Sequence, residues 1–129
     1  MKILKWPNAD LMKVSSEVTN IDFVKSCVDK MFFTMKKENG IGLAAPQVGI
    51  HKRFFILDEK SISSYDQREF DKTLSVIINP RIIDGIGEKV IQEGCLSVPG
   101  EVFWKLRSQT IMVEFTDIEG NNVSKTLAG

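Results

Sequence analysis

Ten residues in the first half of the chain separate two kinds of sequence pattern: Gly40-Ile41-Gly42-Leu43-Ala44-Ala45-Pro46-Gln47-Val48-Gly49. Before them, apolar residues recur at helical spacing, and after them apolar residues stand in short runs of strand length. Two glycines around one residue allow a sharp bend and a close approach of the backbone to a ligand. The same glycines would also suit a simple helix end and turn. Because a helical pattern precedes the segment, it is not the loop of a dinucleotide site, which follows a strand.

The residues before this segment predict one amphipathic helix over residues 22–38. Its apolar stripe repeats three and four residues apart and consists of Phe23, Val24, Cys27, Val28, Met31, Phe32 and Met35. Asp22 is the expected N-cap. Asn39-Gly40 is a helix stop in which Gly40 can adopt the left-handed conformation. Residues 1–20 are expected to form an irregular arm.

The residues after the segment predict a series of short strands. The runs are 53–57, 74–78, 88–92, 102–106, 110–116 and 123–127. Within the run 110–116, Ile111, Val113 and Phe115 fall on one face. Turns are expected at 84–87 and 117–121, and the polar stretch 58–73 is expected to be an exposed loop. One helix followed by many strands predicts an α+β fold with antiparallel sheets, in a single domain over residues 1–129.

Composition and charge argue against several classes of protein. Lys plus Arg and Asp plus Glu number 17 each, so the net charge is zero. A direct nucleic-acid partner is therefore not expected, because phosphate binding needs an excess of positive charge. No apolar run approaches the roughly 20 residues that span a bilayer, and the first residues do not form a signal peptide. The 2 cysteines are too few for a disulfide scaffold, which favours a cytoplasmic location.

A second segment contains further residues suited to chemistry: Glu93-Gly94-Cys95-Leu96-Ser97-Val98-Pro99. Cys95 follows a glycine and stands among charged and turn-forming residues. Cys27, in contrast, lies on the apolar stripe of the predicted helix and is expected to be a small buried hydrophobic residue. The single histidine, His51, is expected to be a solvated loop residue and not a metal ligand.

Taken together, the two segments resemble the first and second signature motifs of peptide deformylase. This metal hydrolase removes formyl groups from the N-termini of new proteins. The resemblance extends to Asn79-Pro80, to residues 50–53 and to the turn at 117–120, and it covers the chain from Leu4 to Gly129. It implies the deformylase α+β fold and a role in protein biosynthesis, with a formyl-methionyl nascent peptide met near the ribosome as the substrate.

The resemblance also implies roles for individual residues. Gln47 would donate a hydrogen bond to the formyl oxygen as it becomes an oxyanion, and the backbone N–H of Leu96 would be the second donor. Cys95 would be one of three protein ligands of an iron or zinc ion. The substrate-binding wall would consist of Gly40, Ile41, Gly42, Leu43, Glu93 and Gly94. Glu93 would also be a supporting acid, paired with Arg107.

The third signature of the family, H-E-x-x-H on a helix, has no match in residues 1–129. In the family it supplies two metal ligands and the general base. We therefore expect a C-terminally truncated deformylase whose fold lacks the central catalytic helix, with weak or absent metal binding and no turnover. Without that helix, apolar side chains would be exposed, each worth roughly 1.5–3 kcal/mol when fully buried. The chain would then be marginally stable or oligomeric.

Two further interpretations stay open. A pseudo-enzyme or binding module would keep the formyl-peptide pocket without hydrolysis, and a structural domain would carry the motifs by coincidence. Both motifs are intact, which favours a shortened gene, a frameshift or a natural stop, since an old binding module would have had no reason to keep Cys95. The nucleotide sequence after the Gly129 codon would separate these cases.

Overall fold

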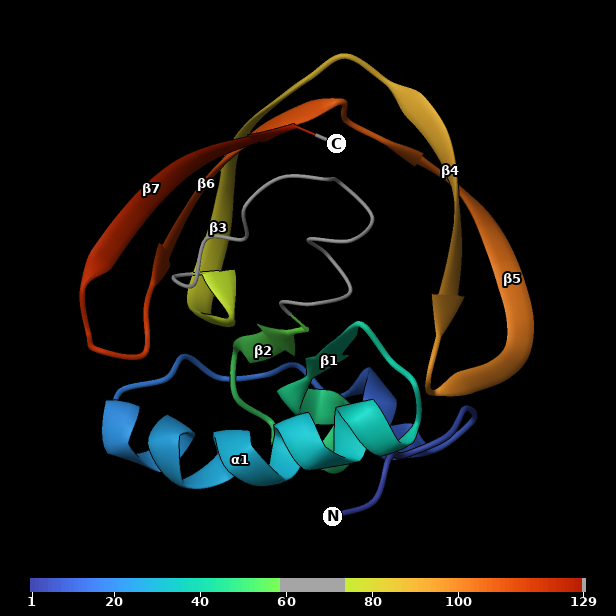
Figure 1. Ribbon diagram of the computed structural model, residues 1–129, viewed down its shortest axis with the longest axis vertical. Coiled ribbons are helices and arrows are strands. Elements are labelled where there is room, and N and C mark those ends of the chain that lie inside the picture. Colours follow the sequence, from blue (N-terminus) through green and yellow to red (C-terminus); the bar gives the residue numbers. More distant parts are fainter. Residues whose placement is uncertain (59–73, 129) are drawn as a thin grey trace.

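The structure is a computed structural model that describes residues 1–58 and 74–128 (Figure 1). Within those residues it contains one α-helix, α1 (Ile21–Lys37), and two short 3-10 helices, η1 (Ala9–Met12) and η2 (Ala45–Val48). The strands are β1 (Gly42–Ala44), β2 (Phe54–Leu57), β3 (Val76–Ile86), β4 (Lys89–Cys95), β5 (Val98–Arg107), β6 (Thr110–Thr116) and β7 (Asn122–Ala128). All strand pairs within the sheets are antiparallel. The expected α+β fold with antiparallel sheets is therefore confirmed.

Helix α1 lies where the apolar stripe predicts it, with two corrections at its ends. The N-cap is Asn20, whose side chain accepts a hydrogen bond from the backbone N–H of Asp22 at 3.0 Å, so Asp22 is the second helical residue and not the cap. At the other end Asn39, with φ 58°, adopts the left-handed conformation expected of Gly40. Asparagine tolerates this region better than most residues. Gly40 therefore does not need the left-handed conformation.

Five strands form one sheet in the order β1-β2-β3-β6-β7, and β4 and β5 form a separate two-stranded ribbon. In Figure 1 the strands β3, β6 and β7 curve upward on one side of the molecule and β4 and β5 on the other, with α1 below both. Strand β1 is the edge strand of the larger sheet. The two motif segments thus belong to different structural units, one at this edge and one at the end of the ribbon.

The strand predictions are right in position: 110–116 coincides with β6 and 53–57 exceeds β2 by one residue, whereas β3, β4, β5 and β7 extend beyond the predicted runs. Strand β3 continues through Asn79-Pro80 to Ile86, so the predicted turn at 84–87 is wrong except at Gly87, which has φ 73°. Two register shifts against β6 let β3 absorb these irregular residues while pairing continues. The expected exposed loop at 58–73 lies, apart from Asp58, outside the described residues.

The predicted alternation along β6 is confirmed. Val113 and Phe115 are buried, Ile111 is half-buried, and Met112 and Glu114 point to solvent. The turn at 117–121 is also confirmed, because the carboxylate of Asp117 accepts hydrogen bonds from the backbone N–H groups of Glu119 and Asn121. These bonds fix the reversal that leads into β7.

The N-terminal arm is more ordered than the sequence predicts. Besides the turn of 3-10 helix, Ser16 forms an isolated bridge with Lys52, and the side chains of Ile3 and Val18 are buried in the core. The side chain of Asn79 donates to the carbonyl of Val18 and accepts from its N–H. The arm therefore packs along the first strands of the sheet.

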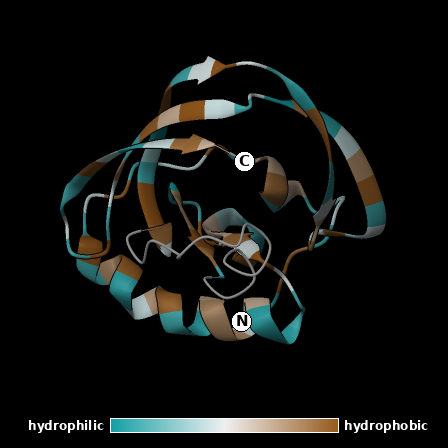
Figure 2. Ribbon diagram, turned by 45° about the horizontal axis from the view of Figure 1, so that its top comes forward, coloured by the Kyte–Doolittle hydropathy of each residue, from teal (hydrophilic) through white to brown (hydrophobic). Residues whose placement is uncertain are grey.

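The main core lies between α1, β1, β2 and the start of β3. It includes Val24, Met31, Met35, Leu43, Phe54, Ile56 and Ile78. Hydrophobic and hydrophilic stretches alternate along α1, as expected for a helix that buries one face (Figure 2). Cys27 belongs to this core, which confirms its structural role.

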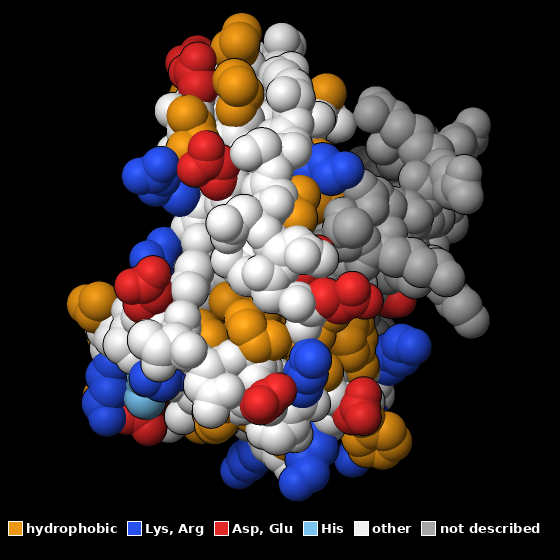
Figure 3. Space-filling view, turned by 90° about the vertical axis from the view of Figure 1, so that its left-hand side faces the viewer, with side chains coloured by type: hydrophobic (Ala, Val, Ile, Leu, Met, Phe, Trp, Pro, Cys, Tyr) orange, Lys and Arg blue, Asp and Glu red, His pale blue; other side chains and the backbone are white. Residues whose placement is uncertain are grey.

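The strands away from α1 leave large apolar side chains exposed, as expected. The largest exposed fractions on the ribbon belong to Trp104 (70%), Val90 (62%) and Leu106 (62%). On the side of the molecule drawn in Figure 3, exposed hydrophobic side chains lie at the end farthest from α1 and also nearer the helix, interspersed with charged side chains of both signs. Within the described ranges, no helix is long and apolar enough to cross a membrane.

Candidate functional site

A groove of about 600 Å³ lies where the two motif segments meet. One wall comes from the end of α1 and the start of β1, and the other comes from the end of β4 and the start of β5. The lining residues are Lys5, Glu38, Asn39, Gly40, Ile41, Gly42, Gln47, Gly94, Cys95, Leu96, Pro99, Gly100 and Glu101. The fold therefore brings residues more than 40 positions apart in sequence to one surface.

The amide of Gln47 is held in a single orientation at the base of this groove. Gln47 lies on η2, where Pro46 occupies the first turn and Gly49 ends the helix in the left-handed region, with φ 82°. Its Oε1 accepts a hydrogen bond from the backbone N–H of Ala44 at 2.9 Å. Because that partner can only donate, the other end of the amide, Nε2, must face the groove.

The Nε2 group of Gln47 points at the second motif. It lies 3.7 Å from Sγ of Cys95 and donates to Oγ of Ser97 at 3.1 Å. Cys95 is the last residue of β4 and pairs with Val98, so Leu96 and Ser97 form the two-residue turn between β4 and β5. The thiol of Cys95 is exposed. An N–H donor and a thiol thus converge on the same open space.

Gly40 is required by close packing and not by its backbone angle. A Cβ atom at Gly40 would lie 2.5 Å from Cδ1 of Leu96 and 3.3 Å from Cγ of Met35. Both distances are shorter than ordinary van der Waals contact, so a side chain here would displace Leu96. The absence of a side chain at Gly40 therefore leaves room for the side chain of Leu96, the residue whose backbone N–H is the predicted second oxyanion donor.

The N-terminal arm ties the two motifs together, which the sequence did not reveal. The backbone N–H of Leu4 donates to the carbonyl of Gln47 at 2.7 Å, and that of Trp6 donates to the carbonyl of Ser97 at 2.8 Å. Between them, Nζ of Lys5 donates to the carbonyl of Leu96 at 2.7 Å. Lys5 and Ser97 are thus parts of the site without a predicted role, since no local pattern marks a contact across 91 residues.

The predicted pairing of Glu93 with Arg107 is present. Nε and Nη2 of Arg107 donate to the two carboxylate oxygens of Glu93 at 2.9 and 2.8 Å. The hydrogen bonds from Arg107 hold the pKa of the Glu93 carboxyl below its ordinary value, and Glu93 in turn raises the pKa of Arg107. This bidentate pair links β4 to β5 shortly before the turn that carries Cys95.

Most of the residues predicted for the site line the groove, and two do not. Gln47, Cys95, Leu96 and Gly94 are on its surface, together with Gly40, Ile41 and Gly42. Leu43 is buried in the core behind the wall, because alternate residues of β1 face opposite sides. Glu93 is turned toward Arg107 and is not part of the lining.

The side chains of the described residues do not by themselves fit a three-ligand metal ion. In residues 1–58 and 74–128, no group of three or more His, Cys, Asp or Glu side chains is placed to hold one. Cys95 is the thiol at the groove, and His51 does not line it. The expectation that His51 is a solvated loop residue is confirmed in part: it lies outside any helix or strand, but it is half-buried and its Nδ1 is buried without a hydrogen-bond partner.

A comparison with known protein families identifies the family of this chain. The family model described as polypeptide deformylase matches residues 1–129. The chain belongs to the peptide deformylase family. A peptide deformylase of Thermodesulfovibrio yellowstonii is 36% identical over 130 residues, which cover 100% of this chain and 75% of the relative. One of Finegoldia magna is 46% identical over 113 residues, covering 86% of this chain and 64% of the relative.

Solved deformylase structures have the same fold. The deformylase of Thermotoga maritima matches with a TM-score of 0.85 and 32% identity, over 99% of this chain and 81% of that one. The deformylase of Synechococcus elongatus in complex with actinonin also gives a TM-score of 0.85, at 30% identity, over 100% of this chain and 66% of that one. The chain thus spans less than two thirds of the Finegoldia and Synechococcus proteins.

Proposed function

We propose that the groove is the formyl-peptide-binding part of a peptide deformylase active site. The observation that carries the proposal is the convergence of Gln47 Nε2 on Cys95 Sγ, at 3.7 Å, from two segments 48 residues apart. The formyl oxygen of a formyl-methionyl peptide would accept hydrogen bonds from Gln47 and from the backbone N–H of Leu96. Such donors stabilise the negative charge that develops on the oxygen during hydrolysis.

The peptide backbone would lie along the free edge of β1. Because β1 pairs with β2 on one side only, its outer N–H and C=O groups can pair with an extended peptide, except for the Ala44 N–H that donates to Gln47. Gly40 and Gly42 carry no side chains that would obstruct this approach. Ile41, which is 62% exposed and lines the groove, offers an apolar contact for the methionine side chain.

Cys95 is proposed as one ligand of the divalent metal on which deformylase chemistry depends. Since the described residues offer no three-ligand set, the remaining ligands and the proton-accepting carboxylate must come from outside them. We therefore propose that a polypeptide of residues 1–129 binds formylated peptides but does not release formate by itself. Hydrolysis would require a helix bearing H-E-x-x-H, supplied by further chain or by a second polypeptide.

Binding and turnover can be tested separately. Fluorescence anisotropy of a labelled formyl-Met-Ala-Ser peptide should show tighter binding than its unformylated counterpart, and Gln47→Ala should weaken it about two- to tenfold, the worth of one hydrogen bond. Gln92→Ala is the matched control, because Gln92 is exposed on β4 and does not line the groove. Equal binding by wild type and Gln47→Ala would contradict the role of Gln47.

Formate release should then be followed with iron or zinc added. We expect no turnover above background from residues 1–129 alone, and recovery when a peptide helix bearing H-E-x-x-H is supplied. Metal-dependent turnover by residues 1–129 alone would show that the ligand set is wrongly assigned. Formyl-specific binding that never leads to formate release, even with the helix present, would favour the alternative of a binding module.

A further inference from the structure

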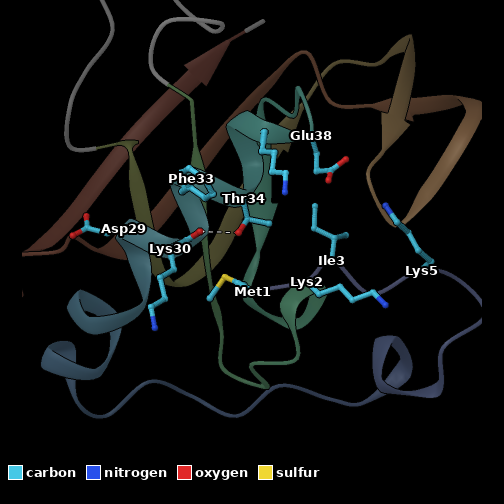
Figure 4. A pocket seen from close by; sticks show the side chains of 10 residues that line it. Met1, Lys2, Ile3, Lys5, Asp29, Lys30, Phe33, Thr34 and Glu38 are labelled. Carbon is cyan, nitrogen blue, oxygen red and sulfur yellow. Dashed lines mark hydrogen bonds between the residues drawn. The ribbon is translucent and has the colours of Figure 1, made fainter.

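A second groove begins where the formyl-peptide groove ends. It has a volume of about 740 Å³ and lies between the N-terminal arm and α1. Figure 4 shows the side chains that line it, from Asp29 and Lys30 at one end to Lys5 and Glu38 at the other. Lys5 and Glu38 line both grooves, so the two grooves adjoin at these residues.

The second groove is positively charged in a chain of zero net charge. Its lining contains the lysines Lys2, Lys5, Lys30 and Lys37 and the acids Asp29 and Glu38. Among the described residues, no ion pair or hydrogen bond involves the ammonium group of Lys2, Lys30 or Lys37, although the carbonyl of Lys30 accepts from the Thr34 hydroxyl. These three ammonium groups therefore have no acidic partner among the described residues and are available to pair with a ligand.

The geometry of the first groove sets which part of a peptide would reach these lysines. If the formyl end sits between Gln47 and Cys95, the following residues run along β1 toward Gly40 and leave the groove at Glu38. Lys37 is adjacent to that exit, and Lys30 is two helical turns further along α1. At 1.5 Å per helical residue this is about 10 Å, the length of roughly three extended peptide residues.

We propose that this second groove is an exosite that binds acidic residues of the nascent peptide, at about residues four to seven when the formyl-methionine is counted as residue one. The inference rests on the proposed function and deepens it by naming a substrate preference. Carboxylates of the peptide pair with Lys30 and Lys37, and the exposed ring of Phe33 packs against the peptide between them. A nascent peptide is favoured over RNA because this groove adjoins the proposed peptide groove at Lys5 and Glu38.

The test compares three labelled peptides on the 129-residue protein. Each begins with formyl-Met-Ala-Ser and continues with four Glu, four Gln or four Lys residues. Anisotropy at low ionic strength should show the Glu peptide binding roughly three- to tenfold more tightly than the Gln peptide, the sum expected of two or three exposed ion pairs. The Lys peptide should bind most weakly. Salt at about 1 M should remove the differences, since the lysines are exposed to solvent.

Two charge-matched variants locate the effect. In K30Q/K37Q the advantage of the Glu peptide should disappear while the affinity for the Gln peptide stays the same. In K25Q/K36Q, which removes two exposed lysines of α1 outside the groove, the advantage should persist. An advantage that survives in K30Q/K37Q, or that falls equally in both variants, would overturn the proposal.

Two further arms separate this inference from the proposed function and from another ligand. An unformylated Glu peptide that keeps its dependence on Lys30 and Lys37, with no gain from the formyl group, would support the exosite and contradict the formyl site. A single-stranded oligouridine that depends on the same lysines and binds more tightly than the Glu peptide would overturn the exosite in favour of RNA.

Discussion

Helix α1 and the β4–β5 ribbon both contain many apolar residues, and they bury them very differently. Val24, Met31 and Met35 of α1 are 0% exposed, whereas Trp104 of β5 is 70% exposed. The stripe of α1 faces the sheet strands β1 and β2, which cover it. A two-stranded ribbon has no second layer of its own and buries a face only when another element packs on it. The apolar content of a segment therefore does not by itself fix how much that segment stabilises the fold.

This difference matters because the site spans both regions. Gln47 comes from the packed region around α1 and β1, and Cys95 comes from the end of the ribbon. The distance between them is set by a few contacts: the hydrogen bonds from the N-terminal arm, the packing of Leu96 against Gly40, and the hydrogen bond from Gln47 to Ser97. The site is thus expected to be only as well ordered as the attachment of the ribbon.

The largest expected effect tests the packing difference itself. Met31→Ala should lower the free energy of unfolding by about 2–5 kcal/mol, because it leaves a cavity in the core. Leu106→Ala, on the exposed ribbon, should change it by less than about 0.5 kcal/mol. Urea denaturation of both variants measures this. A similar cost for the two would mean that the ribbon is covered in solution, for example by a second copy of the chain.

The next effect concerns the junction between the two regions. Gly40→Ala should cost about 1–3 kcal/mol, because the new Cβ overlaps Leu96. It should also weaken formyl-peptide binding, since Leu96 must move. Gly94→Ala is the control for stability alone, because its Cβ would meet nothing closer than the Glu101 carbonyl, at 4.0 Å, although Gly94 lines the groove. Thermal unfolding and peptide binding should be measured together, and unchanged binding in Gly40→Ala would show that Leu96 can shift without cost to the site.

Within the packed region, the third effect concerns which residue is the N-cap of α1. Asn20→Ala removes the side-chain acceptor for the Asp22 N–H and should cost about 1 kcal/mol. Asp22→Ala removes only a favourable charge near the helix N-terminus and should cost about 0.3–1 kcal/mol. Urea denaturation of the two variants measures these costs. A larger loss of unfolding free energy in Asp22→Ala would indicate that Asp22 is the N-cap, as the sequence predicts.

The smallest effect is the pH dependence of the ribbon. The pKa of Glu93 is lowered in the folded state, so its contribution is present above the ordinary pKa of about 4.5 and is lost as the pH falls through the folded value. Because the pair is exposed, this contribution should be about 0.2–1 kcal/mol. Between pH 7 and pH 3, the free energy of unfolding should fall less steeply with decreasing pH in Glu93→Gln than in the wild type. Identical slopes would mean that the pair contributes no stability.

The sequence predicted the elements best where the signal was local and periodic. The helix at 21–37 and strand β6 were placed almost to the residue, because burial on one face imposes a period that can be read directly. The end of β3 was mistaken for a turn because Asp84 and Gly85 are turn-forming residues, and pairing with β6 overrides that preference. The strand β1 within the first motif was missed because three residues are too few to show an alternation.

The sequence by itself determined the family, the α+β order of the elements and the identity of the two motif segments, because these are written in residue types and spacings. The tertiary structure decided which of those residues face the groove, placing Leu43 in the core and Glu93 against Arg107. It alone revealed the hydrogen bonds of Lys5 and Ser97 and the shared border of the two grooves. Such contacts join residues many tens of positions apart, and they depend on the folded path of the chain, which no local pattern specifies.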